Sequence, residues 1–164
     1  MRLFVGIDPG RSGAIAVVDA TGAALGTILL KETDQDVWEW MLKMLGIGAT
    51  ARPGHFAVLE RVGAMPRQGL SSTFKFGTSY GFCRGLLTAN QIAYEEATPV
   101  SWQTAMKCRT KGDKNVTKAA AQRLFPTVKI THANADALLI AEYARRTWFT
   151  RSAGTHERGA KVDQ

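Results

Sequence analysis

The order of apolar runs and helical periodicities predicts an α/β protein whose sheet begins with antiparallel strands. Three short apolar runs, joined by turns that contain glycine, open the chain. Helical and strand-like segments then alternate, and the chain closes with three helical segments. The 164 residues have the length of a single domain, which is large enough to bury a substantial core.

The three opening strands are short and their connections are tight, which is typical of an antiparallel meander. They are expected at residues 2–8, 13–19 and 23–30. Two further strands are expected at residues 55–60 and 92–98. Helices are expected at residues 34–45, 71–88, 99–106, 116–125 and 134–149. We therefore assign residues 1–149 to one folded domain and expect the polar residues 150–164 to form a flexible tail.

Several classes of protein are disfavoured by composition. No apolar run approaches the roughly 18 residues that span a bilayer, and the short apolar start is interrupted by Asp8, unlike a signal peptide. The two cysteines, Cys83 and Cys108, form neither a disulfide framework nor a zinc-ligand spacing. We expect a protein of a reducing compartment without membrane contact.

The charge of the chain is strongly basic and concentrated in its middle. Lysine and arginine number 21 against 14 acidic residues, a net charge of +7. Residues 61–135 hold eleven of the basic residues and only three of the acidic ones, so the remainder is nearly balanced. A solvated face is one explanation, and a surface that contacts nucleic-acid phosphates is the other.

Three acidic residues stand where strands and a helix begin or end. Asp8 ends the first strand before a Pro-Gly turn, Glu60 ends the fourth strand, and Asp136 lies near the start of the last helix. If the two strands are adjacent, both carboxylates emerge at one edge of the sheet, where α/β proteins place their sites. His132 precedes Asp136 by four residues, so both side chains can face the same volume.

Such a group would hold one or two hard divalent cations, because Mg²⁺ prefers oxygen ligands and Mn²⁺ also accepts an imidazole. Each residue taken alone has a simpler explanation. Asp8 is a typical turn residue, Glu60 a solvated strand end, Asp136 a helix-terminal acid and His132 a surface histidine. The ordered set of three acids is the more specific signal.

Three segments together resemble the RuvC-type Holliday junction resolvases, which have the ribonuclease H-like fold. They are residues 5–10 (Val-Gly-Ile-Asp-Pro-Gly), 59–60 (Leu-Glu) and 135–143 (Ala-Asp-Ala-Leu-Leu-Ile-Ala-Glu-Tyr). The resemblance extends over residues 4–146 and is nearest to phage-encoded and other short members, which carry segments similar to residues 60–66 and 76–81. It implies a mixed sheet with an antiparallel start and helices on both faces.

The resemblance also implies a metal site. Asp8, Glu60 and Asp136 match the metal-binding acids of the family. A fourth ligand usually stands three residues before the last acid, an aspartate in many members and a histidine in some. Here that position is Ala133, and His132 is the nearest candidate, one residue out of register. The family pattern implies two Mg²⁺ ions per active site, with Mn²⁺ as a substitute.

The implied activity is the paired nicking of four-way DNA junctions by a homodimer in the cytoplasm, either at the nucleoid or in a phage-infected host; an organelle is the alternative location. Glycines four residues apart in the helix at 71–88 line one face and allow close packing of a second subunit. These are Gly77, Gly81 and Gly85.

Residues for DNA contact follow from the same resemblance. Four lysines resemble those that grip DNA in the family, namely Lys107, Lys111, Lys114 and Lys118. Arg61 and Arg67 flank the loop after Glu60. Three apolar side chains near that loop are candidates to wedge or stack at the junction centre, namely Met65, Phe74 and Phe76. Core packing is the alternative role of the two phenylalanines.

Three other functions compete with this interpretation. The first motif also fits an actin-like phosphotransferase, but that fold needs two such lobes and the chain has room for one. A non-catalytic nucleic-acid-binding protein is a second alternative, disfavoured because unneutralised carboxylates repel phosphates. A nuclease acting on flaps, forks or branched DNA in general is the third, and the sequence does not separate it from a junction resolvase.

Overall fold

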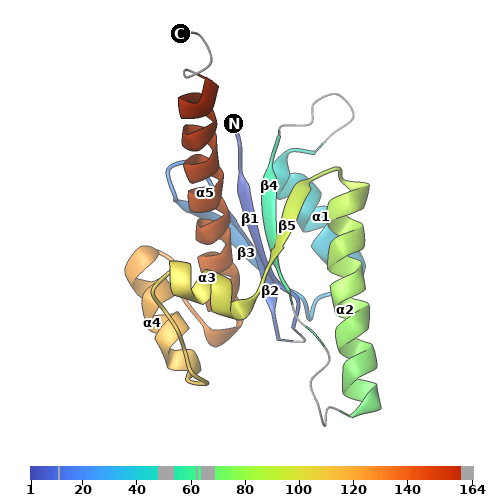
Figure 1. The fold of residues 1–164 in the computed structure, drawn as a ribbon. Helices are drawn as coiled ribbons and strands as arrows, with labels where there is room; N and C mark the ends of the chain where they lie inside the picture. Colours follow the sequence, from blue (N-terminus) through green and yellow to red (C-terminus); the bar gives the residue numbers. More distant parts are fainter. Residues whose placement is uncertain (11, 48–53, 62, 64–68, 160–164) are drawn as a thin grey trace.

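The structure, a computed structural model, describes residues 1–10, 12–47, 54–61, 63 and 69–159 (Figure 1). Its centre is a five-stranded sheet in the order β3-β2-β1-β4-β5. The strands are β1 (Phe4–Asp8), β2 (Ala14–Val18), β3 (Ala24–Leu29), β4 (Phe56–Glu60) and β5 (Ala93–Ala97). The pairs β1–β2 and β2–β3 are antiparallel, whereas β1–β4 and β4–β5 are parallel. The predicted antiparallel start of a mixed sheet is confirmed.

Helices cover both faces of this sheet, as predicted (Figure 1). They are α1 (Asp34–Leu45), α2 (Leu70–Ala89), α3 (Pro99–Ala105), α4 (Lys114–Leu124) and α5 (His132–Gly159). Helices α1 and α2 lie on one face, where their apolar side chains join one buried cluster with the sheet. Helices α3, α4 and α5 lie on the other face and complete a second cluster.

Strand β1 divides its side chains between the two clusters because successive residues of a strand point to opposite faces. Phe4 joins the cluster under α5, whereas Val5 and Ile7 join the cluster under α1 and α2. Gly6 faces α5, and a Cβ atom on it would lie 2.1 Å from the backbone nitrogen of Ala141. The missing side chain of Gly6 therefore lets α5 lie directly against β1.

Helix α5 is longer than the sequence indicated, since it begins at His132 and continues to Gly159 instead of running over residues 134–149. At its start, the Asn134 N–H donates to Thr131 Oγ1 (3.3 Å) and the Thr131 N–H donates to Asn134 Oδ1 (2.8 Å). These reciprocal bonds have the geometry of a capping box, which fixes the first turn.

At the other end, the ring centroid of Trp148 lies 5.2 Å from that of Phe56. Arg151 forms an ion pair with Glu95 one turn later. Residues 150–159, the first part of the predicted tail, are thus helical. No helix in the described ranges has the length and apolar character needed to cross a bilayer.

Candidate active site

Asp8 is the last residue of β1 and leads into a tight turn. Its Oδ1 accepts a hydrogen bond from the Gly10 N–H (3.1 Å), and the Gly13 N–H donates to the Gly10 carbonyl (2.8 Å). A Cβ atom on Gly13 would lie 2.0 Å from the Asp8 carbonyl oxygen, so the turn closes only with glycine there. Burial raises the pKa of Asp8, the Gly10 hydrogen bond opposes this, and the charge of Asp136 raises it further.

Glu60 is the last residue of β4, the parallel neighbour of β1. Ile7 of β1 is paired with Leu59 of β4, so Asp8 and Glu60 follow side by side at the carboxyl edge of the sheet. A hydrogen bond holds the Glu60 side chain in place, because the indole Nε1–H of Trp102 donates to Glu60 Oε1 at 2.8 Å. Burial, together with the charges of Asp8 and Asp136, raises the pKa of Glu60 to about 7.

Asp136 lies one turn into α5, which the Gly6 contact holds against β1. Its Oδ1 is buried and is the only buried side-chain nitrogen or oxygen among the described residues that lacks a hydrogen-bond partner. Its negative charge raises the pKa of both Asp8 and Glu60. The three carboxylates predicted from the sequence therefore lie near enough to interact electrostatically, at the ends of β1 and β4 and the start of α5.

The donor set fits a hard divalent cation. Over the described ranges, no three histidine, cysteine, aspartate or glutamate side chains lie close enough together to hold a metal ion without rearrangement. However, the unpartnered Oδ1 of Asp136 is a free acceptor in a buried place, where an unsatisfied oxygen is costly. The repulsion that raises the pKa values of Asp8 and Glu60 is relieved by a cation. Carboxylate oxygens are also the ligands that Mg²⁺ prefers.

His132 is the exposed first residue of α5, four residues before Asp136. Because both residues belong to the helix, they lie on the same face of α5, one turn apart. This placement brings His132 to the end of the helix that carries Asp136. No hydrogen bond or ion pair fixes its ring among the described residues.

Of the predicted DNA-contacting residues that the structure describes, Lys114 interacts electrostatically with the acids. It is the exposed first residue of α4, and its positive charge lowers the pKa of both Asp8 and Glu60. Lys118 follows one turn later and is half-buried. Lys107 and Lys111 are exposed, with positive φ angles of 54° and 46°, in the loop before α4. Lys107 lines a separate hollow together with Arg123 and Arg146, in which none of the three acids takes part.

The remaining predicted residues lie before, within or after residues 62–68, a stretch of which the structure describes only residue 63. Arg61 is exposed directly after Glu60, and its N–H donates to the Ala97 carbonyl at 2.7 Å. Phe74 is 78% exposed on α2, so core packing is excluded for it in this chain, whereas Phe76 is half-buried. Met65 and Arg67 lie outside the described residues.

Sequence reasoning missed Trp102. It is fully buried and belongs to the short helix α3, which the sequence predicted without giving Trp102 a role. Its partner Glu60 lies 42 positions earlier in the chain. A buried tryptophan usually finds a partner for its indole N–H, but the sequence did not indicate which acceptor it finds.

Comparison with known proteins supplies the fold. No protein-family model and no curated protein matches the sequence. Among solved structures, T. thermophilus RuvC in complex with a Holliday junction substrate superimposes with a TM-score of 0.63 at 18% identity, covering 92% of this chain and 96% of that one. The chain has the RuvC fold. A further Thermus thermophilus RuvC structure gives a TM-score of 0.60 at 17% identity over the same shares.

The predicted fold class is thereby confirmed, since the five-stranded mixed sheet of this chain is the RuvC sheet with helices on both faces. At these identities the likeness concerns the fold alone. In this chain, Asp8 and Glu60 stand at the carboxyl ends of β1 and β4, and Asp136 lies in the second turn of α5, the helix packed against β1.

Proposed function

We propose that this protein is a metal-dependent DNA endonuclease that resolves four-way junctions by nicking two strands of like polarity. One observation carries the proposal: the carboxylates of Asp8, Glu60 and Asp136, one with an unpartnered buried oxygen, interact electrostatically with one another and with Lys114. Carboxylates next to a basic surface suit phosphodiester chemistry, because cations neutralise the acids and lysines attract the phosphates. The RuvC fold, solved elsewhere with a Holliday junction, supports the choice of substrate.

Asp8, Glu60 and Asp136 would hold the metal, with His132 as the further ligand at the start of α5. Two Mg²⁺ ions per site, or Mn²⁺ in their place, suit this set of oxygens and one imidazole. When bound, such ions stabilise negative charge on the scissile phosphate and provide an activated water at neutral pH.

The chain's own residues orient the site and the DNA. The Trp102 indole fixes one oxygen of Glu60, which leaves the other oxygen to face the site. His132, if it is not a ligand, accepts the proton that the attacking water loses. Phosphate contacts are assigned to the basic residues around the site, because these position DNA without reading its sequence. They are Arg61, Arg67, Lys107, Lys111, Lys114 and Lys118.

Two active sites are needed for paired nicking, so we propose a homodimer formed through α2. The exposed glycines Gly77, Gly81 and Gly85 each have open space where a Cβ atom would stand. They lie on the outer side of a helix whose Leu70 and Phe74 are also exposed, at 91% and 78%. Phe74, with Phe76 and Met65, is then placed at the junction centre. A protein that sediments as a monomer at micromolar concentration contradicts this dimer.

The test is cleavage of a synthetic mobile four-way junction in Mg²⁺ or Mn²⁺, beside linear duplex, fork and flap substrates of the same sequence. We expect cutting of the junction by the wild-type protein, and loss of cutting with retained binding for Asp8→Asn. His132→Ala is expected to cut more slowly and to depend differently on metal concentration. Preferential cutting of forks or flaps would assign the protein to the broader branched-DNA nucleases instead.

The control for the metal site is a second acid in the same protein. Asp19→Asn removes a carboxylate that already accepts hydrogen bonds from its own turn, through Thr21 and Ala23. It is expected to cut at the wild-type rate. If Asp8→Asn cuts the junction at the wild-type rate, the assignment of the site is wrong.

We propose that the protein meets four-way junctions at the nucleoid or in the cytoplasm of a phage-infected host.

A further inference from the structure

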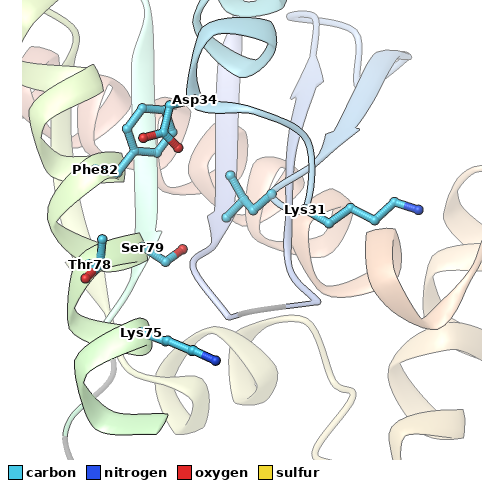
Figure 2. Close-up of a pocket in the computed structure, with 7 residues that line it drawn as sticks. Lys31, Asp34, Lys75, Thr78, Ser79 and Phe82 are labelled. Carbon is cyan, nitrogen blue, oxygen red and sulfur yellow. The ribbon is translucent and has the colours of Figure 1, made fainter. Parts of the chain in front are cut away.

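A pocket lies between the start of α1 and the middle of α2, next to the proposed active site (Figure 2). Its volume is about 410 Å³, which falls within the roughly 300–1,000 Å³ of pockets that bind small groups. The lining residues are Leu30, Lys31, Asp34, Lys75, Thr78, Ser79 and Phe82. Neither lysine belongs to the DNA-contacting set that the sequence indicated, and none of the proposed metal ligands lines the pocket.

The pocket is attached to the turn that follows Asp8. The Ser79 hydroxyl donates to the Pro9 carbonyl oxygen at 2.9 Å, and Pro9 is the next residue after Asp8. This bond joins the helix that carries Lys75 to the turn that carries the first acid. A second hollow, lined by Ser12, Gly13, Leu29, Lys31 and Ala133, begins on the other side of the same turn.

Lys31 lines both hollows, so the two lie next to each other. Ala133, in the lining of the second hollow, stands between His132 and Asn134 in the first turn of α5. The two hollows therefore lie beside α2, the turn after Asp8 and the start of the helix that carries Asp136.

The charges of the pocket favour an anion. Lys31 and Lys75 are exposed, and neither forms an ion pair with another described residue. Asp34 is the one acid in the lining, and Figure 2 shows it beside Phe82, at the opposite end from Lys75. An anion is therefore repelled from the Asp34 end and attracted toward the Lys75 end.

The hydroxyl groups of the lining do not add donors. Ser79 donates to Pro9, and the Thr78 hydroxyl donates to the Phe74 carbonyl oxygen at 2.9 Å. Their hydrogens are thus already committed, and the two lysine ammonium groups are the cationic donors left for an anion. Lysine side chains are flexible, so they attract an anion by charge and select little for its shape. This is typical of contacts to a DNA backbone.

We propose that Lys75 binds a backbone phosphate of the cleaved strand that neighbours the scissile phosphate, and that Lys31, whose side chain extends away from Lys75 (Figure 2), contacts the same strand. The inference rests on the proposed function, which it deepens by naming a second phosphate subsite. The Ser79–Pro9 hydrogen bond makes the position of Lys75 depend on the turn after Asp8. A phosphate held in this pocket would consequently fix the register of the strand against the acids.

The first test measures junction binding by fluorescence anisotropy in EDTA over a series of salt concentrations. Lys31→Ala and Lys75→Ala are each expected to weaken binding by about three- to tenfold and to reduce the slope of log K against log salt by about 1. The matched control is Lys43→Ala, an exposed lysine in the last turn of α1. It lies nine positions beyond Asp34, about 13 Å along the helix, and it should leave the slope unchanged.

The second test finds the phosphate itself. Junctions are prepared with one uncharged methylphosphonate at a time along the cleaved strand, and the affinity of each is compared with that of the unmodified junction. The wild-type protein and Lys43→Ala should lose affinity at one position beside the cleavage site. Lys75→Ala should be insensitive at that same position, because the partner of the missing charge is already removed.

The two levels of the proposal fail in different ways. If the wild-type protein cuts the junction, but Lys31→Ala and Lys75→Ala bind it with the same slope of log K against log salt as Lys43→Ala, the pocket is not a phosphate subsite. The same conclusion follows if every methylphosphonate affects Lys75→Ala and the wild type alike. If the wild-type protein neither binds nor cuts the junction, the proposed function fails, and the subsite fails with it.

Discussion

Trp102→Phe tests how the fold prepares Glu60 for its role. The substitution removes the indole N–H that donates to Glu60 Oε1 at 2.8 Å. Trp102 is 0% exposed and Glu60 is 9% exposed, so water does not readily replace the lost donor. Phenylalanine keeps an aromatic ring in the second core cluster, which limits the change in packing to the difference between the two rings.

The expected loss of stability depends on pH. The pKa of Glu60 is about 7, so the carboxylate is ionised at about pH 8 and protonated at about pH 5. A hydrogen bond to an ionised group contributes about 1.5–3 kcal/mol, and one to a neutral group about 0.5–1.5 kcal/mol. The packing loss is the same at both pH values. Trp102→Phe should therefore destabilise the protein by about 1 kcal/mol more at the higher pH.

The assay is denaturant unfolding in EDTA at both pH values, for the variant and the wild type. The control is Trp40→Phe, since Trp40 is half-buried against the other core cluster and no carboxylate accepts its indole bond among the described residues. Its destabilisation should be equal at the two pH values. An equal effect of Trp102→Phe at both pH values would refute the role of the indole in holding the ionised Glu60.

Three further predictions follow from the same contacts. Gly6→Ala should destabilise the protein by about 3 kcal/mol or more, because its Cβ would meet the α5 backbone at 2.1 Å. A melting temperature equal to that of the wild type would contradict this. Burial raises the pKa of Glu142, but hydrogen bonds from two arginines hold this pKa below its ordinary value. Glu142 therefore stabilises the folded protein above about pH 4.5, and this stabilisation is lost as the pH falls. In Glu142→Gln, the free energy of unfolding should fall less steeply as the pH is lowered below about 4.5. A fall as steep as that of the wild type would contradict this. The pKa of Glu60 is about 7 in the folded protein against an ordinary 4.5, so the folded protein binds more protons than the unfolded chain between pH 4.5 and pH 7. The free energy of unfolding in EDTA should therefore fall by about 3 kcal/mol as the pH rises through this range. Mg²⁺ should reduce this fall, and identical stability curves with and without metal would count against a metal site.

The features that the sequence predicted well are those set by neighbours along the chain. The three opening strands follow from short apolar runs and glycine turns, and both are local signals. The positions of Asp8 and Glu60 at strand ends follow from the same runs. Their juxtaposition needed one further step, that β1 and β4 are adjacent and parallel, which the register of Ile7 with Leu59 establishes.

The features that the sequence left open depend on contacts between distant segments. The bond of Trp102 to Glu60 joins residues on α3 and β4, and no periodicity identifies an indole as a partner of a particular acid. The length of α5 beyond residue 149 depends on an aromatic contact with β4 and on an ion pair with Glu95. Lys31 lies outside the basic segment 61–135 and Lys75 lies within it, and only the packing of α2 beside the turn after Asp8 brings them to one pocket.

The arrangement of the acids explains why the scaffold around them is so constrained. Burial and neighbouring negative charges raise the pKa values of Asp8 and Glu60, so these carboxylates oppose folding when they are ionised and no cation is present. Two contacts keep them together against this repulsion: the close approach of α5 to β1 at Gly6, and the Trp102 bond to Glu60. Because the fold bears this repulsion before any ligand arrives, a divalent cation gains affinity without having to assemble its ligands. The two contacts that hold the acids together in the metal-free protein would therefore also prepare the proposed metal site.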